Sequence, residues 1–449
     1  MEDFFENELI KKFEDMIENH DELYFDSEEI EQIIVYYLEL GDISYAERAV
    51  HHGLSIHPNS IDIKIKYLEV LLELEDYTTA RKLINELQEN SQESTDFLVC
   101  CAKYYSNLGN SKKAIALCEK ALQLGEELNF LHNFIADECV NIGEPFRALS
   151  HYQKALHEDP EDDYALENCM RCFAELKKPK DALLFLNDYL DRFPYSETAW
   201  YEMGQFYFNR KEYKKAINSF DYLLAINSNA VGVYTNKATC YEALKDYEKA
   251  IEIYEEVLEI EFTKAYTYHR IGLCYRALNK PIIALKYFQK SLIEDPQYYP
   301  AMMEQSFVYE ALHAMEEALH FAKEATMLNE GNLEYQKRLA YLYIERSRFD
   351  EGAICLKKIV DAEPNRFYNW YAYIEVLMLL EEYEEAIRTL SIGLKRHKRA
   401  ELYYQLSHCH FQLNQNQLAQ EALQNAIALD ESLMGEMQKK YPSIREKKN

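Results

Sequence analysis

Apolar residues recur along this chain at the spacing i, i+3, i+4 and i+7, which predicts amphipathic α-helices joined in pairs. Residues 199–224, AWYEMGQFYFNRKEYKKAINSFDYLL, show one complete pair. The pattern predicts a first helix from Ala199 to about Asn209, a short turn, and a second helix from near Glu212. The chain is therefore expected to fold as helix-turn-helix units.

The helical pair repeats with a period of 34 residues. A small residue on the second helix marks each period, at Ala46, Ala80, Ala114, Ala148, Ala182, Ala216, Ala250, Ala284, Ala318, Gly352 and Ala386, and after 33 residues at Ala419. Two antiparallel helices approach closely only where one side chain is small, so this residue has a packing reason. Eleven units fill residues 27–400 (11 × 34 = 374), and a twelfth, starting at Ala400, is one residue short.

Prolines support the same phase of the repeat. Pro145, Pro179 and Pro281 occupy the same repeat position, at which the second helix opens and a missing backbone N–H costs nothing. Apolar residues at helical spacing within residues 1–26 predict a helix that covers the first unit. At the other end, SLMGEMQKKY predicts a polar last helix that is stopped by Pro442.

The unit resembles a tetratricopeptide repeat, whose pattern is Trp, Leu, Gly, Tyr, Ala, Phe, Ala, Pro. The sixth unit supplies Trp200, Met203, Gly204, Tyr207, Ala216, Phe220 and Leu223. The eighth unit supplies Tyr268, Ile271, Gly272, Tyr275, Ala284, Phe288, Ser291 and Pro296. The resemblance implies an all-α, right-handed solenoid of about twelve units over residues 27–431. An acidic capping helix is expected at residues 1–26, and a capping helix with a basic tail at residues 432–449.

The chain is strongly acidic, with a formal charge of 49 − 78 = −29. This charge repels phosphates, which disfavours nucleic-acid partners and docking on anionic membranes. No apolar run approaches the roughly 20 residues of a membrane span, and the acidic start MEDFFENELIKKFEDM lacks the apolar region of a signal peptide. We therefore predict a cytoplasmic protein without membrane insertion.

Candidate catalytic or metal-binding chemistry is weak. Cys169 and Cys172 form a single CxxC, but no second pair follows, and other cysteines share their repeat positions. Burial as small apolar residues is therefore the favoured interpretation. His408 and His410 point to different faces of a helix, so they do not chelate one ion. The sequence contains no phosphate-binding loop, so we predict a non-enzymatic protein without cofactor or metal.

The resemblance implies that function lies in a concave groove lined by the first helix of each unit, where such proteins hold peptides. The groove positions with basic and aromatic character are Tyr266, His269, Arg270, Arg276, Phe307, Lys337, Arg338, Tyr341 and Tyr371. A secondary set consists of Asn168, Arg171, Tyr201, Gln205 and Asn236. Basic and aromatic residues in repeats eight to ten suit an acidic or C-terminal peptide. The alternative is that the arginines pair with Glu304, Glu310 and Glu334 and only hold repeats together.

The carboxylate clamp of chaperone-binding repeat proteins is not present in this pattern. That clamp needs Lys and Asn at the fifth and ninth positions of one unit, whereas here Lys337 is followed by Tyr341. The asparagine ladder of sugar-transferring relatives is also interrupted, because Glu202 and Arg270 stand between or beside the matching asparagines.

We therefore predict a scaffold or adaptor that binds another protein. The main alternative is a permanent subunit of a larger assembly, and an RNA-binding repeat is disfavoured by the charge. Residues 1–31 hold 13 acidic residues against Lys11 and Lys12. This acidic stretch is a solvated helix face, a recruitment site for a basic partner, or a segment that folds over the basic groove of a neighbouring copy.

Overall fold

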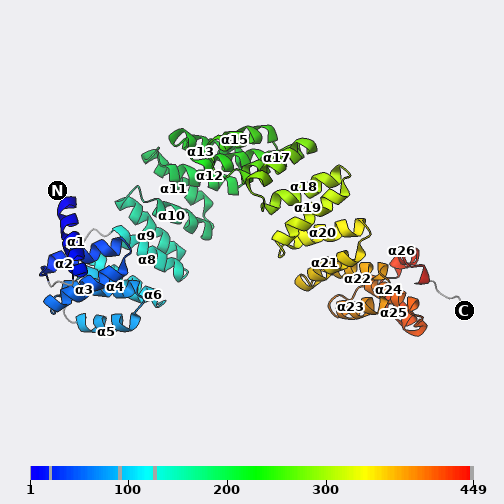
Figure 1. The fold of residues 1–449 in the computed structure, drawn as a ribbon, viewed down its shortest axis with the longest axis horizontal. Helices are drawn as coiled ribbons and strands as arrows, with labels where there is room; N and C mark the ends of the chain where they lie inside the picture. Colours follow the sequence, from blue (N-terminus) through cyan, green and yellow to red (C-terminus); the bar gives the residue numbers. More distant parts are fainter. Residues whose placement is uncertain (1, 20–22, 89–93, 125–128, 445–449) are drawn as a thin grey trace. The chain divides into compact units, whose positions relative to one another are not determined.

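A computed structural model of the chain describes residues 2–19, 23–88, 94–124 and 129–444. Within these ranges the backbone forms α-helices and two short 3-10 helices, and no strand (Figure 1). Parts of the sequence-based expectations lie outside the described residues: residues 1 and 20–22 of the N-terminal cap and residues 445–449 of the basic tail. The all-α solenoid architecture is confirmed.

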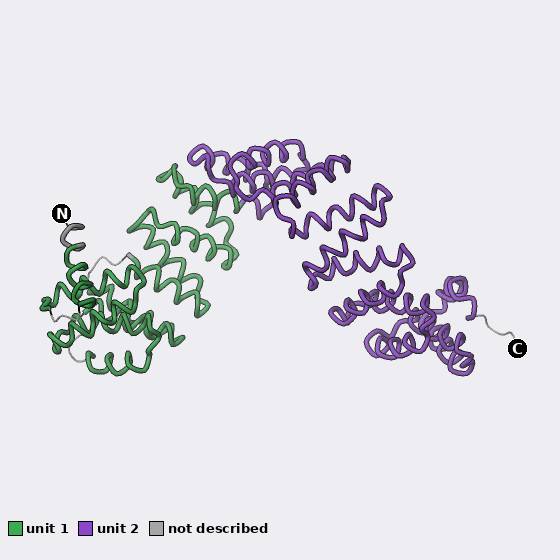
Figure 2. The backbone as a smooth tube through the Cα atoms, viewed as in Figure 1, with its two compact units in different colours: residues 1–206 green, residues 207–449 purple. Residues whose placement is uncertain are grey.

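The helices fall into two compact units, residues 1–206 and 207–449 (Figure 2). The first unit contains α1 (Glu2–Asn19), α2 (Ser27–Glu39), α3 (Ile43–Ile56), α4 (Ile61–Glu73), α5 (Tyr77–Leu87), α6 (Thr95–Asn107), α7 (Ser111–Gln123), α8 (Asn129–Asn141), α9 (Pro145–Glu158), α10 (Asp163–Glu175) and α11 (Pro179–Arg192). Helix α12 (Glu197–Asn209) includes the boundary.

The second unit continues with α13 (Tyr213–Ile226), α14 (Val231–Ala243), α15 (Tyr247–Ile260), α16 (Ala265–Ala277), α17 (Pro281–Glu294), α18 (Tyr299–Ala311), α19 (Met315–Leu328), α20 (Leu333–Glu345), α21 (Phe349–Ala362), α22 (Phe367–Leu379), α23 (Tyr383–Arg396), α24 (Ala400–Gln412) and α25 (Asn416–Leu429). The chain then forms η1 (Glu431–Leu433), α26 (Met434–Lys440) and η2 (Pro442–Ile444). We call the even-numbered helices from α2 to α24 the first helices, and the odd-numbered helices from α3 to α25 the second helices.

The predicted helix limits agree with the structure to within a few residues. For residues 199–224, α12 ends at Asn209 as expected, and α13 begins at Tyr213, one residue after the predicted start. Pro145, Pro179 and Pro281 stand in the first turn of α9, α11 and α17, as predicted. Side-chain caps close other helices, such as the capping box of Asp26 and Glu29 at α2.

A left-handed residue follows every first helix from α2 to α24. The described residues with positive φ are three glycines and nine others, at 41, 75, 109, 143, 177, 211, 245, 279, 313, 347, 381 and 414. For example, the N–H of Asn279 donates to Arg276 O over 2.9 Å, and the N–H of Lys280 donates to Tyr275 O over 2.9 Å. The same two bonds recur at each position, so each first helix ends in a Schellman turn that reverses the chain.

The periodic small residues are buried where paired helices meet. Ala216, Ala250, Ala284 and Ala318 have no exposed surface. On the first-helix side, a Cβ added to Gly272 would overlap the buried ring of Phe288. Close contact between helix backbones at these positions therefore excludes larger side chains.

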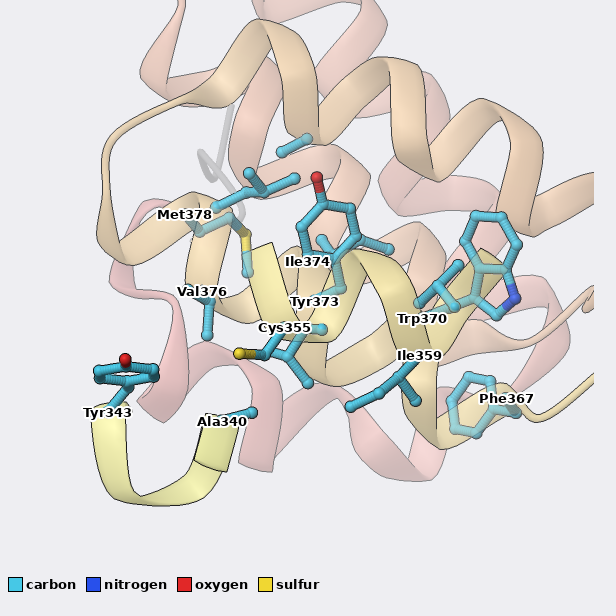
Figure 3. Packing of buried hydrophobic residues seen from close by; sticks show 14 of the residues in the cluster. Ala340, Tyr343, Cys355, Ile359, Phe367, Trp370, Tyr373, Ile374, Val376 and Met378 are labelled. Atoms are coloured by element: carbon cyan, nitrogen blue, oxygen red, sulfur yellow. The ribbon is translucent and has the colours of Figure 1, made fainter. Parts of the chain in front are cut away.

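Apolar residues from successive helices form the cores. In the first unit, α1 contributes Ile10, Phe13 and Met16 to the same cluster as α2 and α3, and the Phe13 and Phe25 rings meet edge to face at 6.0 Å. In the second unit, Trp370 of α22 belongs to a cluster that extends from Met302 of α18 to Ile444 of η2 (Figure 3). All ten cysteines are buried, as predicted, and burial raises the pKa of their thiols.

The left-handed turns predict that replacing lysine by glycine stabilises the protein at a turn and destabilises it inside a helix. Lys245→Gly should raise the free energy of unfolding by about 0.5–1 kcal/mol, because lysine is strained at φ 62° and glycine is not. Lys286→Gly, on an exposed position inside α17, should lower it by about the same amount. Urea denaturation of both variants measures these changes. A change in the free energy of unfolding with the same sign in both variants would contradict the role of the turn.

Close packing at Gly272 predicts a second pair of outcomes. Gly272→Ala should lower the free energy of unfolding by about 1–3 kcal/mol, because the new methyl group must displace the buried Phe288 ring. Gly232→Ala in α14 is the matched control, since its Cβ would meet no atom within 4 Å. Thermal unfolding should leave the Gly232 variant unchanged or slightly more stable; a loss there equal to that of the Gly272 variant would contradict this packing argument.

Candidate functional site

Ion pairs connect successive first helices in the second unit. Arg270 of α16 donates from Nε and Nη2 to the two carboxylate oxygens of Glu242 on α14, over 3.1 and 2.7 Å. The next pair, Arg276 with Glu304, joins α16 to α18 with the charges reversed. These partners are each 28 residues apart (270 − 242 = 304 − 276 = 28), so the contact repeats with the solenoid.

We call this series of ion pairs between first helices the ladder. Arg338 extends it from α18 to α20 and is the least exposed of its arginines. Its Nη1 lies 2.6 Å from Glu310, and its Nη2 donates to Ser306 O over 3.1 Å. Only 8% of the Arg338 side chain is exposed. Lys337 pairs with Glu334 at 2.8 Å and with Glu363 at 3.2 Å. Four of the predicted basic residues thus pair with glutamates of this chain: Arg270, Arg276, Lys337 and Arg338. Three of the partners are Glu304, Glu310 and Glu334, whereas Arg270 pairs with Glu242.

Exposed aromatic rings lie against these arginines. Tyr266, Phe307 and Tyr341 are 41%, 38% and 46% exposed. The Arg270 guanidinium lies 5.9 Å from the Tyr266 ring centroid, and that of Arg338 lies 4.3 Å from Phe307 and 5.8 Å from Tyr341. The Arg276 guanidinium lies 5.8 Å from Phe307. We call Tyr266, Arg270, Arg276, Phe307, Arg338 and Tyr341 the aromatic–arginine stripe.

His269 is adjacent to the stripe and does not extend its charge. Its ring is 5.9 Å from Phe288 and 5.5 Å from Tyr298, between centroids. Burial lowers the pKa of His269 to about 4, and the nearby Arg270 and Arg276 contribute to the same shift. The imidazole is therefore neutral at pH 7. Its buried Nδ1 has no hydrogen-bond partner among the described residues.

The remaining predicted site residues occupy several environments. Asn168 is buried, and its Nδ2 donates to Tyr164 O over 2.9 Å, so it presents no amide to solvent. Arg171 on α10 is exposed. The other three members of the secondary set are half-buried on first helices: Tyr201, Gln205 and Asn236. Tyr371 lies on α22 and contacts Lys440, which belongs to α26.

The roles of the carboxylates on the first helices were only partly predictable from the sequence. Glu242 was not named as a partner of Arg270, although the separation of 28 residues would have revealed it. Glu202 of α12 was predicted only as an interruption of the asparagine ladder. Burial raises its pKa to about 7, and the Glu167 carboxylate contributes to the same shift. Asp137 of α8 accepts hydrogen bonds from Tyr152 and Tyr164, at 2.5 and 2.7 Å.

The described residues offer little for metal or membrane chemistry. Within them, no group of three or more His, Cys, Asp and Glu side chains is arranged to hold a metal ion. None of their helices has both the length and the apolar character that a membrane crossing requires. Cys169 and Cys172 are both buried on α10, and burial raises the pKa of each thiol.

Models of protein families match several parts of the chain. Models described as tetratricopeptide repeat match residues 229–292, 102–126 and 400–433. The model described as anaphase-promoting complex, cyclosome, subunit 3 matches residues 175–257. These matches fall on the helical hairpins of both units.

Curated proteins give partial matches. The chain is similar to Hsp70-Hsp90 organizing protein 3 of Arabidopsis thaliana, with 27% identity over 181 residues, which are 38% of this chain and 31% of that protein. It is similar to Hsp70-Hsp90 organizing protein of Triticum aestivum, with 27% identity over 38% of this chain and 30% of that protein. The chain thus spans less than a third of the length of these relatives.

Solved structures also resemble the chain. A chain of the APC/C hetero-tetramer Cut9-Hcn1 is 15% identical, with 89% of each chain covered and a TM-score of 0.37. The MamA protein is 26% identical over 38% of this chain and 92% of that chain, with a TM-score of 0.33. A tetratricopeptide repeat protein from Parabacteroides merdae is 19% identical over 56% of this chain and 98% of that chain, with a TM-score of 0.38.

The burial of the Arg338 side chain predicts that its loss lowers the stability of the protein. Arg338→Met should lower the free energy of unfolding by about 3 kcal/mol, because Glu310 loses its charged partner in a half-buried position. Arg388→Met is the control, since this α23 side chain is 73% exposed beside Glu385, and its loss should cost less than about 0.5 kcal/mol. Guanidinium chloride would mask ion pairs, so urea denaturation is the measurement. Equal small losses would contradict a structural ladder.

Proposed function

Because this chain is a tetratricopeptide-repeat protein, we propose that it is a non-enzymatic scaffold that binds a segment of another protein on the first-helix surface of α16, α18 and α20. The observation that carries the proposal is the aromatic–arginine stripe. Three large aromatic side chains stay partly exposed there, on three consecutive first helices. Aromatic and arginine side chains are the residue types that supply most binding energy at protein interfaces.

The stripe is organised in advance of binding. Glu242 and Glu310 hold Arg270 and Arg338 in fixed positions beside the rings of Tyr266 and Phe307. A ligand that packs on these rings need not order the arginines first, so less conformational entropy is lost on binding. The ladder thus supports binding by positioning side chains, in addition to joining the helices.

The proposed ligand is an acidic or C-terminal segment, bound mainly through its apolar and aromatic side chains. Arg276 is the stripe cation most open to an incoming carboxylate, since 42% of its side chain is exposed. All three arginines of the stripe already pair with glutamates, so a ligand carboxylate must use their remaining N–H groups. We expect charge to set orientation and the aromatic contacts to provide most of the affinity.

A chaperone tail is not the proposed ligand, although the chain is similar to Hsp70-Hsp90 organizing proteins over part of its length. The clamp of such proteins needs Lys and Asn at fixed positions. Here Lys337 is bound to Glu334 and Glu363, and Tyr341 stands at the asparagine position. The partner is therefore proposed by its chemistry alone.

A permanent subunit role is the second candidate. It is favoured by exposed apolar side chains on second helices, which include Ile293 of α17, Met327 of α19 and Ile354 of α21, at 77%, 60% and 60% exposure. The match to the anaphase-promoting complex subunit 3 model is consistent with such a role. A cytoplasmic location and a basic partner for the acidic N-terminal helix remain predictions.

Removal of the aromatic rings should strongly weaken capture of the partner. Phe307→Ala combined with Tyr341→Ala should reduce retention of a specific protein from cell extract at least about tenfold, because the ligand loses its main contacts. Both rings are partly exposed, so the free energy of unfolding should change little. Quantitative affinity capture against the wild-type chain is the measurement.

Phe146→Ala provides the matched control, because this phenylalanine at the start of α9 is 67% exposed and lies outside the stripe. It should retain every partner. Unchanged capture by the Phe307 and Tyr341 double variant would overturn the proposed site. A wild-type chain that is stable only when co-purified with fixed stoichiometric partners would favour the permanent subunit instead.

A further inference from the structure

The segment after α25 folds back onto two first helices. Tyr441 and Ile444 are buried in the same core cluster as residues of α22 and α24. Helix α26 has only seven residues, which is too short to be stable without tertiary contacts. Its polar anchors contact α22, which belongs to the hairpin before that of α24.

Glu375 of α22 holds the two adjacent side chains of this segment. Lys440 Nζ lies 2.6 Å from Glu375 Oε2, and the Tyr441 hydroxyl donates to Glu375 Oε1. Lys440 Nζ also lies 2.8 Å from the Tyr371 hydroxyl and 4.8 Å from the centroid of its ring. Gln405 Nε2 of α24 donates to the same Oε1 over 3.1 Å. One carboxylate and one aromatic ring therefore bind a lysine–tyrosine pair.

His408 of α24 completes the site. Its ring stacks on Tyr441 with centroids 4.9 Å apart and planes at 28°. Its Nδ1 is 2.7 Å from Ser443 Oγ. Burial lowers the pKa of His408, although Glu375 opposes this shift, so a neutral imidazole faces the tyrosine. Tyr371 and Glu375 stand at the fifth and ninth positions of their unit, where the repeat pattern placed ligand-facing side chains.

We propose that this surface of α22 and α24 is a docking site for a partner segment with adjacent lysine and tyrosine, and that residues 440–444 are an intramolecular competitor for it. We call Tyr371, Glu375, Gln405 and His408 the lysine–tyrosine site. Its chemistry is the reverse of an acidic-peptide site, because its fixed charge is a carboxylate. The segment already bound there shows which side chains the surface accepts.

Competition follows from how the segment is held. Lys440 is 40% exposed although it carries two of the polar anchors, so solvent reaches these bonds. The buried apolar contacts of the segment come from Met437, Tyr441 and Ile444. Its release is a local opening that leaves the hairpins of the solenoid intact. A partner segment then binds only to the fraction of molecules in which the site is open, so its apparent affinity is lowered.

The test uses the full chain and a defined probe. The probe is a fluorescein-labelled synthetic peptide with the sequence of residues 434–444, MGEMQKKYPSI. The released variant carries Lys440→Glu and Tyr441→Ala, which remove the competitor's anchors. Fluorescence anisotropy should show at least about tenfold tighter binding of the probe to the released variant than to the wild-type chain.

Two controls define the site. Glu375→Gln added to the released variant should weaken probe binding at least about tenfold, because the probe loses its charged partner. Glu381→Gln, at the exposed turn after the same helix, should have no effect. A probe that carries glutamate and alanine in place of its own lysine–tyrosine pair should not bind. Equal binding to the folded released variant and to the wild type, or indifference to Glu375→Gln, would overturn the proposal.

A second measurement covers the case in which the released variant does not fold. Hydrogen exchange of the wild-type chain should show faster exchange in residues 434–441 when unlabelled probe is present in large excess. Unchanged protection of these amides at saturating probe would overturn the proposal. The lysine–tyrosine site does not use the aromatic–arginine stripe on α16, α18 and α20, so either can fail without the other.

Discussion

A single backbone conformation, repeated after each first helix, sets the geometry on which everything else in this protein depends. A left-handed residue places two hydrogen bonds across the end of the helix, and the chain reverses into the second helix with little freedom. Most of these residues are not glycine, so the fold holds lysine, glutamate or serine in a strained region at a cost of about 1–2 kcal/mol each. The packing of the two helices around a buried small residue offsets that cost.

Because the chain reversal is the same in each helical pair, equivalent positions of successive first helices face one another at regular intervals. Arg270 therefore meets Glu242, and Arg338 meets Glu310, both after 28 residues. Partly buried ion pairs contribute little net stability compared with apolar contacts, because both charges lose hydration. Their value here is positional: the pairs fix the arginines beside exposed aromatic rings, and so define the surface on which a partner segment is proposed to bind.

The sequence was sufficient for the parts of the fold that depend on short-range pattern. Helix limits around Asn209 and the prolines at α9, α11 and α17 were predictable, because periodicity and a missing N–H act locally. The candidate site was predictable only as a set of positions. Whether Arg276 is free or paired depends on Glu304 in the next unit, and sequence alone left both possibilities open. The ion pair between Lys440 and Glu375 could not be predicted from the sequence, because it depends on how a short final helix packs.

The central claim is that a partner segment contacts the aromatic–arginine stripe, and contact is most directly measured by crosslinking. A photo-reactive phenylalanine analogue at position 307 should crosslink one partner protein in cell extract, through one short segment that mass spectrometry can locate. The same analogue at position 354, on the second helix α21, serves as the comparison. A specific crosslink from position 307 alone is the predicted result. The same products from both positions, or a specific product only from position 354, would contradict the account.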